Sequence, residues 1–220
     1  MSSPRQSTQL LLLRVFSLGR RSERLFDALA THWRHVGNIR LIAGPDLATT
    51  TVEPHEFLGF LSGKLARSFI EGPETLDLRL SETDHEPDPD GRFRVSDFFC
   101  YDDTWQMVLS RLAGESDAVL MDLRGFSPQN RGVTHEINEL IDHVPLGRVV
   151  FVVDDTTDEG FLRQTVQEAW ARMSPDSPNR SSTLGRLYLF RFTGARGDLR
   201  RLLYALCTSA GAESHKAARV

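Results

Sequence analysis

Short apolar runs alternate with amphipathic helical periods along most of this chain. The runs are bounded by turn-forming residues and have the composition of buried strands. They span residues 10–17, 39–43, 118–123, 148–153 and 187–192. The segments between them repeat apolar residues at helical spacing, as Leu25, Leu29 and Trp33 do. This alternation predicts an α/β fold, in which helices cover both faces of an open, mainly parallel five-stranded sheet.

The order of the strands follows from how parallel strands are connected. Right-handed crossovers and the alternation with helices favour a flavodoxin-like order, 2-1-3-4-5. In that order the direction of winding reverses between the first and the third strand. Ligands of open α/β sheets bind at such a switch, outside the carboxyl ends of the strands. We therefore expect residues 17–21 and 123–136 to line a binding crevice.

Residues 54–101 interrupt the regular alternation. Apolar spacing predicts a helix over 54–70, and 71–101 is predicted to be a hairpin or loop insertion on the main sheet. Within that insertion, 76–80 alternates like an edge strand and 93–101 has the pattern of a second short strand. The insertion is too short to bury a core of its own. We expect a single domain over 9–210, followed by a polar C-terminal tail at 211–220.

Composition and charge exclude several classes of protein. The chain is 40% hydrophobic and 25% charged, which is typical of a globular domain rather than a disordered one. A net charge of −4 argues against a non-specific nucleic-acid binder. The 2 cysteines have no metal-ligand spacing, and no apolar stretch approaches the length of a membrane span. We expect a cytoplasmic protein without a metal site, a resident cofactor, a membrane or a nucleic-acid partner.

One carboxylate follows the third predicted strand. A Gly-containing polar loop leads from that strand to a helix predicted over 133–143, and Glu136 falls in the expected first turn of that helix. Glu136 shares the inner edge of the helix with Val133 and Leu140. One interpretation is a functional carboxylate at the crevice. The other is a structural glutamate, favoured by the helix dipole or by a capping box.

The residues around Glu136 carry a family resemblance. The strand, the loop with Ser127, Asn130 and Gly132, and the helix that begins near Val133 resemble the corresponding segment of Toll/interleukin-1 receptor (TIR) domains. They equally resemble nucleoside 2-deoxyribosyltransferases, which share the flavodoxin-like fold. The resemblance covers roughly residues 10–195. In both groups a Glu on the helix after this strand acts at an N-glycosidic bond, and the resemblance implies that role for Glu136.

The chemistry of that reaction suggests parts for other residues. Breaking an N-glycosidic bond builds positive charge on the sugar, and a carboxylate such as Glu136 can stabilise it. Asp122 at the strand end is a candidate to orient a ribose hydroxyl, and Ser127 and Asn130 in the following loop are candidates to contact the substrate. A phosphate fits a helix start with a guanidinium nearby. The candidates for that phosphate site are Ser17, Gly19 and Arg20, although Arg20 is equally well explained as a solvated surface residue.

Three functional hypotheses follow from these observations. The first is an N-glycosidase that acts on NAD or another nucleotide as substrate, with Glu136 essential. The second is a non-enzymatic module that binds a nucleotide or a protein partner in signalling or defence, and self-association is a property the resemblance implies. The third is a different nucleotide-pocket fold with a structural Glu136. The enzyme hypothesis predicts a half-buried Glu136 with a raised pKa in a crevice, whereas the module predicts an exposed Glu136 or a blocked crevice.

Overall fold

A computed structural model describes residues 7–14, 20–43, 69–180 and 187–211. These residues form a seven-stranded sheet in which every paired strand runs parallel to its neighbour. The strands are β1 (Thr8–Arg14), β2 (Gly37–Ala43), β3 (Phe69–Ile70), β4 (Val95–Cys100), β5 (Ala118–Asp122), β6 (Val149–Val153) and β7 (Tyr188–Arg191). The α/β class and the mainly parallel open sheet are confirmed.

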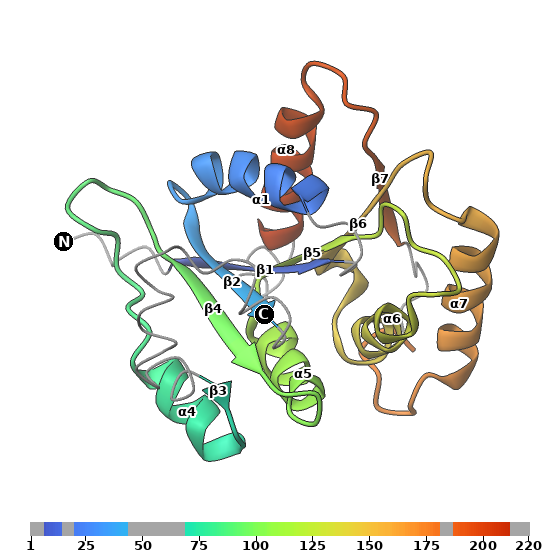
Figure 1. Cartoon of the computed structure of the whole chain (residues 1–220), viewed down its shortest axis with the longest axis horizontal. Coiled ribbons are helices and arrows are strands. Elements are labelled where there is room, and N and C mark those ends of the chain that lie inside the picture. Colours follow the sequence, from blue (N-terminus) through green and yellow to red (C-terminus); the bar gives the residue numbers. More distant parts are fainter. Residues whose placement is uncertain (1–6, 15–19, 44–68, 181–186, 212–220) are drawn as a thin grey trace, which may run out of the picture.

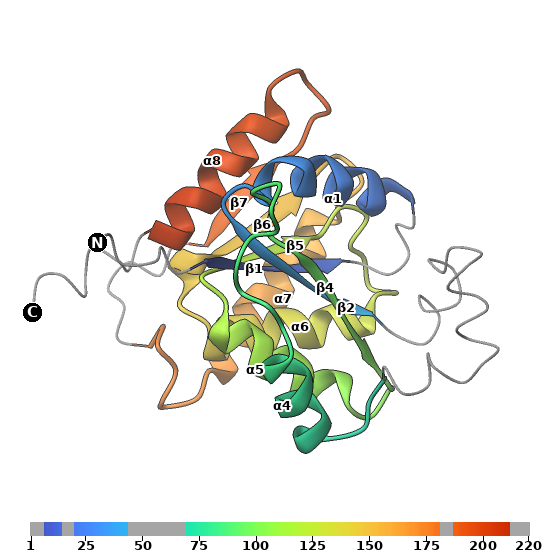
Figure 2. The same ribbon diagram turned by 90° about the vertical axis from the view of Figure 1, so that its left-hand side faces the viewer.

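Helices cover both faces of this sheet (Figures 1 and 2). On one face lie α1 (Arg20–Trp33) and α8 (Asp198–Gly211). On the other lie α4 (Pro73–Ser81), α5 (Trp105–Glu115), α6 (Arg131–His143) and α7 (Glu159–Arg172), with a 3-10 turn at Leu146–Arg148 before β6. None of the described helices is long and apolar enough to span a membrane.

Each face of the sheet has its own apolar core, because side chains alternate along a strand. In β1, Leu10 and Leu12 pack with α1 and α8, whereas Leu11 and Leu13 pack with α5 and α6. A strand buried on both faces is apolar at most of its positions, which explains the run of four leucines in β1. In α1, Trp33 is fully buried and closes the core at the end of the helix.

The predicted strand number and order are wrong. The sheet has seven strands in the order β3-β4-β2-β1-β5-β6-β7. The five expected strands are β2, β1, β5, β6 and β7, and β4 and β3 continue the sheet beyond β2. The central strand β1 pairs with β2 on one side and β5 on the other, so the direction of winding reverses between β1 and β5.

One extra strand, β4, comes from the region interpreted as an insertion, and the other, β3, comes from the end of the helix predicted over 54–70. Instead of a hairpin, the insertion holds α4 and the parallel strand β4. The predicted edge strand at 76–80 is wrong, because Pro73 begins a helix there and Leu76 is its buried position while Leu78 is exposed. Residues 54–68 of the predicted helix lie outside the described residues. The end of that prediction is wrong, because Phe69 and Ile70 form β3.

Gly37 marks a close approach between the two strands β1 and β2. The sequence suggests that this glycine ends the first helix, but α1 ends at Trp33 and Gly37 is the first residue of β2. A Cβ atom on Gly37 would lie 1.9 Å from the carbonyl oxygen of Thr8. Only glycine fits where β2 begins to pair with β1.

Candidate functional site

Polar and charged side chains gather where β1, β5 and β6 end. Arg14 closes β1, Asp122 closes β5, and Asp154 directly follows β6. The beginning of α1 adds Arg21 and Ser22 to this edge. This is the switch region, where an open α/β sheet binds its ligands. These residues lie at the strand ends where a binding crevice is expected.

Asp122 is fully buried, and both of its oxygens accept hydrogen bonds. Oδ2 accepts from Ser22 Oγ at 2.7 Å and from Arg124 Nη2 at 2.7 Å. Oδ1 accepts from Arg124 Nε at 2.8 Å and from the backbone N–H of Arg124 at 3.2 Å. The Arg124 guanidinium thus binds the Asp122 carboxylate in the bidentate geometry that arginine favours. The carboxylate proposed to orient a ribose hydroxyl is already fully paired.

Arg124 connects three parts of the carboxyl edge. Besides Asp122, its Nη2 donates to the backbone carbonyl of Arg21 at 3.1 Å. Its guanidinium carbon lies 5.3 Å from the ring centre of Phe192, just after β7. Arg124 is buried, and only this combination of carboxylate, carbonyl and aromatic ring offsets the loss of its hydration. The resulting network fixes the start of α1 against β5.

Arg21 extends the network toward β6. Its Nη2 donates to Asp154 Oδ2 at 2.5 Å, and half of the Arg21 side chain is exposed. Thr156 donates to Asp154 Oδ1 through its backbone N–H and its hydroxyl. Burial acts to raise the pKa of Asp154, but the Thr156 hydrogen bonds and the Arg21 guanidinium outweigh it and lower that pKa. Asp154 is therefore an anion that holds Arg21 in place.

The loop after β5 is held by its own polar side chains. Asn130 Oδ1 accepts from the Ser127 backbone N–H at 2.9 Å and from Ser127 Oγ at 3.0 Å, and the Asn130 N–H donates back to the Ser127 carbonyl. These two residues were predicted to contact a substrate. In the structure they shape the turn that leads into α6, in the manner of Asx and Ser/Thr turns.

Glu136 is the least satisfied buried acid in this part of the molecule. The residue is 5% exposed, and its Oε2 has no hydrogen-bond partner among the described residues. Burial raises the pKa of its carboxyl group from 4.5 to about 8. The raised pKa agrees with the enzyme hypothesis. The expected half-buried position does not, because Glu136 is almost completely buried.

The helix that carries Glu136 begins earlier than predicted. Because α6 starts at Arg131, Glu136 lies in its second turn, and the first turn contains no acidic residue. The prediction of a first-turn position is wrong. A capping box and a favourable helix dipole both act within the first turn. Neither accounts for Glu136, which weakens the structural explanation of this residue.

Glu136 and Asp122 lie on opposite faces of the sheet. Asp122 is two residues after Leu120, whose side chain packs with α1 and α8, and it contacts Ser22 of α1. Glu136 belongs to α6, which covers the other face, and the neighbouring His135 ring packs edge-on against Trp105 of α5. No hydrogen bond or ion pair among the described residues joins Glu136 to the Asp122 network.

The remaining predicted site residues are placed only in part. Ser17 and Gly19 lie outside the described residues, and Arg20 is the first residue of α1, with its side chain also outside them. Sequence reasoning missed Arg124 and Ser22 as partners of Asp122. The spacing Asp-x-Arg at a strand end was the available signal for Arg124. Within the described part of the chain, no group of three His, Cys, Asp or Glu side chains is arranged to hold a metal ion.

Comparison with known proteins finds no relative of this chain. No protein-family model, curated protein or solved structure matches the chain. The functional argument therefore rests on the geometry of the carboxyl edge and on Glu136.

Proposed function

We propose that this chain is a TIR-like domain that binds a nucleotide at the carboxyl edge of its sheet. We further propose that Glu136 promotes cleavage of the N-glycosidic bond of NAD or a related nucleotide. One observation carries the proposal: a buried carboxyl group with an unpartnered oxygen and a pKa of about 8, on the helix that follows β5. Unsatisfied buried acids are costly to the fold and are concentrated at functional sites.

The protonation of Glu136 suits a cationic substrate. At pH 7 the free protein holds this carboxyl group mainly neutral, since its pKa is about 8. The nicotinamide ring of NAD carries a positive charge, and a nearby cation lowers a carboxyl pKa. Substrate binding therefore ionises Glu136 at the place where the sugar develops positive charge, and the released proton goes to solvent.

The reaction balances without a further reagent. The bond between the nicotinamide nitrogen and the anomeric carbon breaks, and its electron pair leaves with nicotinamide, which becomes neutral. The sugar becomes an oxocarbenium ion, which the Glu136 carboxylate stabilises. A water oxygen then bonds to the anomeric carbon and loses a proton, giving ADP-ribose. The basic group for the phosphates at the same edge is the half-exposed Arg21, whose guanidinium also pairs with Asp154.

The test is release of nicotinamide from NAD by concentrated protein. The wild type should release it, and Glu136→Gln should not, because an amide cannot become an anion. Glu139→Gln is the matched control, since Glu139 lies on the same helix and pairs with His143 at the surface. The wild-type kcat/KM should rise with pH up to about 8 as the carboxyl group ionises. Equal release by the wild type and Glu136→Gln would refute the catalytic role.

A second candidate is a binding module of the same fold without catalysis. The occupied oxygens of Asp122 favour it, because the group expected to orient a ribose is already paired with Arg124 and Ser22. This candidate predicts that ADP-ribose or NAD binds in a calorimetric titration while no nicotinamide is released. Glu136→Gln should then bind as the wild type does. Self-association or a protein partner in signalling or defence would be examined next, by light scattering in the presence of the bound nucleotide.

A further inference from the structure

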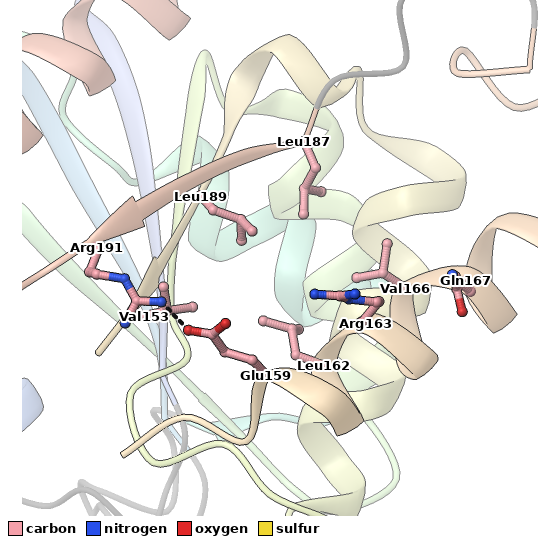
Figure 3. A pocket seen from close by; sticks show the side chains of 9 residues that line it. All are labelled: Val153, Glu159, Leu162, Arg163, Val166, Gln167, Leu187, Leu189 and Arg191. Atoms are coloured by element: carbon pink, nitrogen blue, oxygen red, sulfur yellow. Dashed lines mark hydrogen bonds and ion pairs between the residues drawn. The ribbon is translucent and has the colours of Figure 1, made fainter. Parts of the chain in front are cut away.

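A pocket of about 290 Å³ lies between β7 and α7, at the edge of the sheet (Figure 3). Its walls are largely aliphatic. They are formed by Val153, Leu162, Val166, Leu187 and Leu189. The volume is at the lower limit of small-molecule sites, which are mostly apolar with a few polar groups. The pocket has room for a small apolar body rather than for a whole dinucleotide.

Two arginines line the pocket, and they differ in their partners. Arg191 forms ion pairs with Glu159 and with Asp155. Arg163 lines the pocket from α7 and makes no hydrogen bond or ion pair with another described residue. In Figure 3 its guanidinium lies below Leu187 and extends along the cavity toward Leu162. The pocket thus combines an apolar wall with a guanidinium group, that of Arg163, which pairs with no described residue.

We propose that this pocket binds a small amphipathic acid, with its apolar tail against the leucines and its carboxylate on Arg163. The Arg163 guanidinium argues for an anion, because it has no carboxylate partner among the described residues, whereas Arg191 already has two. The aliphatic walls argue for a tail, because they remove apolar surface from water on binding. A short-chain or medium-chain fatty acid meets both requirements.

This site is separate from the one proposed for the nucleotide. Strand β6 lies between β5 and β7, and the pocket residues come from β7, α7 and the end of β6. Neither Glu136 nor Asp122 lines it. The inference therefore does not depend on the proposed N-glycosidase activity.

The test uses octanoate as the probe in calorimetric titrations of the wild-type chain. Octanamide keeps the tail without the charge, and acetate keeps the charge without the tail. We expect octanoate to bind more tightly than either compound. Arg163→Gln should weaken octanoate binding about tenfold, as expected for one lost charge-assisted contact at a partly exposed site. Arg172→Gln is the matched control, because Arg172 is also on α7 but pairs with Glu168.

A second variant tests the apolar wall. Val166→Phe places a larger side chain in the cavity and should remove octanoate binding without unfolding the chain, since Val166 is only partly buried. Shifts of backbone amide resonances should map octanoate to the ends of β7 and the middle of α7. Equal binding of octanoate and octanamide, wild-type affinity in Arg163→Gln, or no binding at all would overturn the proposal.

Discussion

Glu136→Gln should make the chain more stable at neutral and alkaline pH, although it removes a glutamate from the middle of a helix. Glutamine resembles the protonated carboxyl group in shape, and it cannot ionise. The wild type must keep Glu136 neutral when folded, because burial raises its pKa to about 8, whereas the unfolded chain ionises it near 4.5. The variant removes that conflict and leaves the other acidic groups as they are.

The sign and the size of the effect follow from linkage. When the pKa of a group is higher in the folded state than in the unfolded state, the group contributes its full stabilisation at pH values below its pKa in the unfolded chain. That contribution to the free energy of unfolding is lost as the pH rises through the pKa of the folded state. The window therefore runs from about pH 4.5 to about pH 8. At 1.36 kcal/mol per pH unit, the loss over the whole window is about 5 kcal/mol, and at pH 7 it is about 3 kcal/mol.

Urea denaturation at several pH values measures this directly. The difference in unfolding free energy between Glu136→Gln and the wild type should grow from pH 4.5 to pH 8 and then level off. Glu74→Gln is the matched control, because Glu74 is exposed in the first turn of α4, and its difference should not change over that range. A difference for Glu136→Gln that stays constant with pH would refute both the raised pKa and its cause.

Three further predictions concern other described side chains. Asp122→Ala should lower the free energy of unfolding in urea by about 3–5 kcal/mol, because Arg124 is left buried without its carboxylate. The double variant Asp122→Ala with Arg124→Leu should recover much of that loss. Equal losses in the single and the double variant would count against the pairing. Asn179→Ala should cost about 3 kcal/mol in the same assay, because the Asn179 amide bonds three buried backbone groups. In the native chain a thiol reagent should modify the exposed Cys207 but not the buried Cys100, because burial raises the pKa of the Cys100 thiol to about 12. Mass spectrometry of the treated chain checks this. Rapid modification of Cys100 would show that it is accessible.

The strands that the sequence predicts well are those buried on both faces. β1, β5 and β6 are unbroken apolar runs, because each packs against helices above and below. The edge region is harder to predict, since Leu76, Leu78 and Leu80 fit the alternation of a strand, while Leu76 and Leu80 alone also share one side of a helix. Only Pro73 at the helix start distinguishes the two, and it favours the helix that is found.

The extra strands illustrate a different limit. β3 has only two residues, and its pattern continues the helical spacing that precedes it in the sequence. β4 has an exposed first residue and carries Asp97 within it, so it lacks the apolar run of a central strand. β4 joins the sheet by pairing with β2, and β3 joins it by pairing with β4, and local sequence reveals neither pairing.

The polar residues at the ends of β1 and β5 could be located from the sequence, but most of their pairing could not. The winding of the strands places the switch between β1 and β5, where the polar residues gather. Besides the nearby Arg124, however, Asp122 pairs with Ser22, which is 100 residues away in the sequence, and Arg21 reaches Asp154 across 133 residues. Such pairs arise from tertiary packing and leave no periodic signal. The opposite faces of Asp122 and Glu136 follow from strand register, which can be used once the strand ends are known.

The pairing of β1 with β5 also has a consequence for how the chain is made. The hydrogen bond from Gln9 to Asp117 spans 108 residues, so β1 leaves the ribosome long before its second neighbour exists. At bacterial or eukaryotic synthesis rates that interval lasts roughly 5–20 s. Throughout it, the leucine-rich strand has one edge without a partner, and such edges attract other chains. The nascent polypeptide therefore passes through a period in which the part of its sequence that covers this edge of β1 has not yet been made.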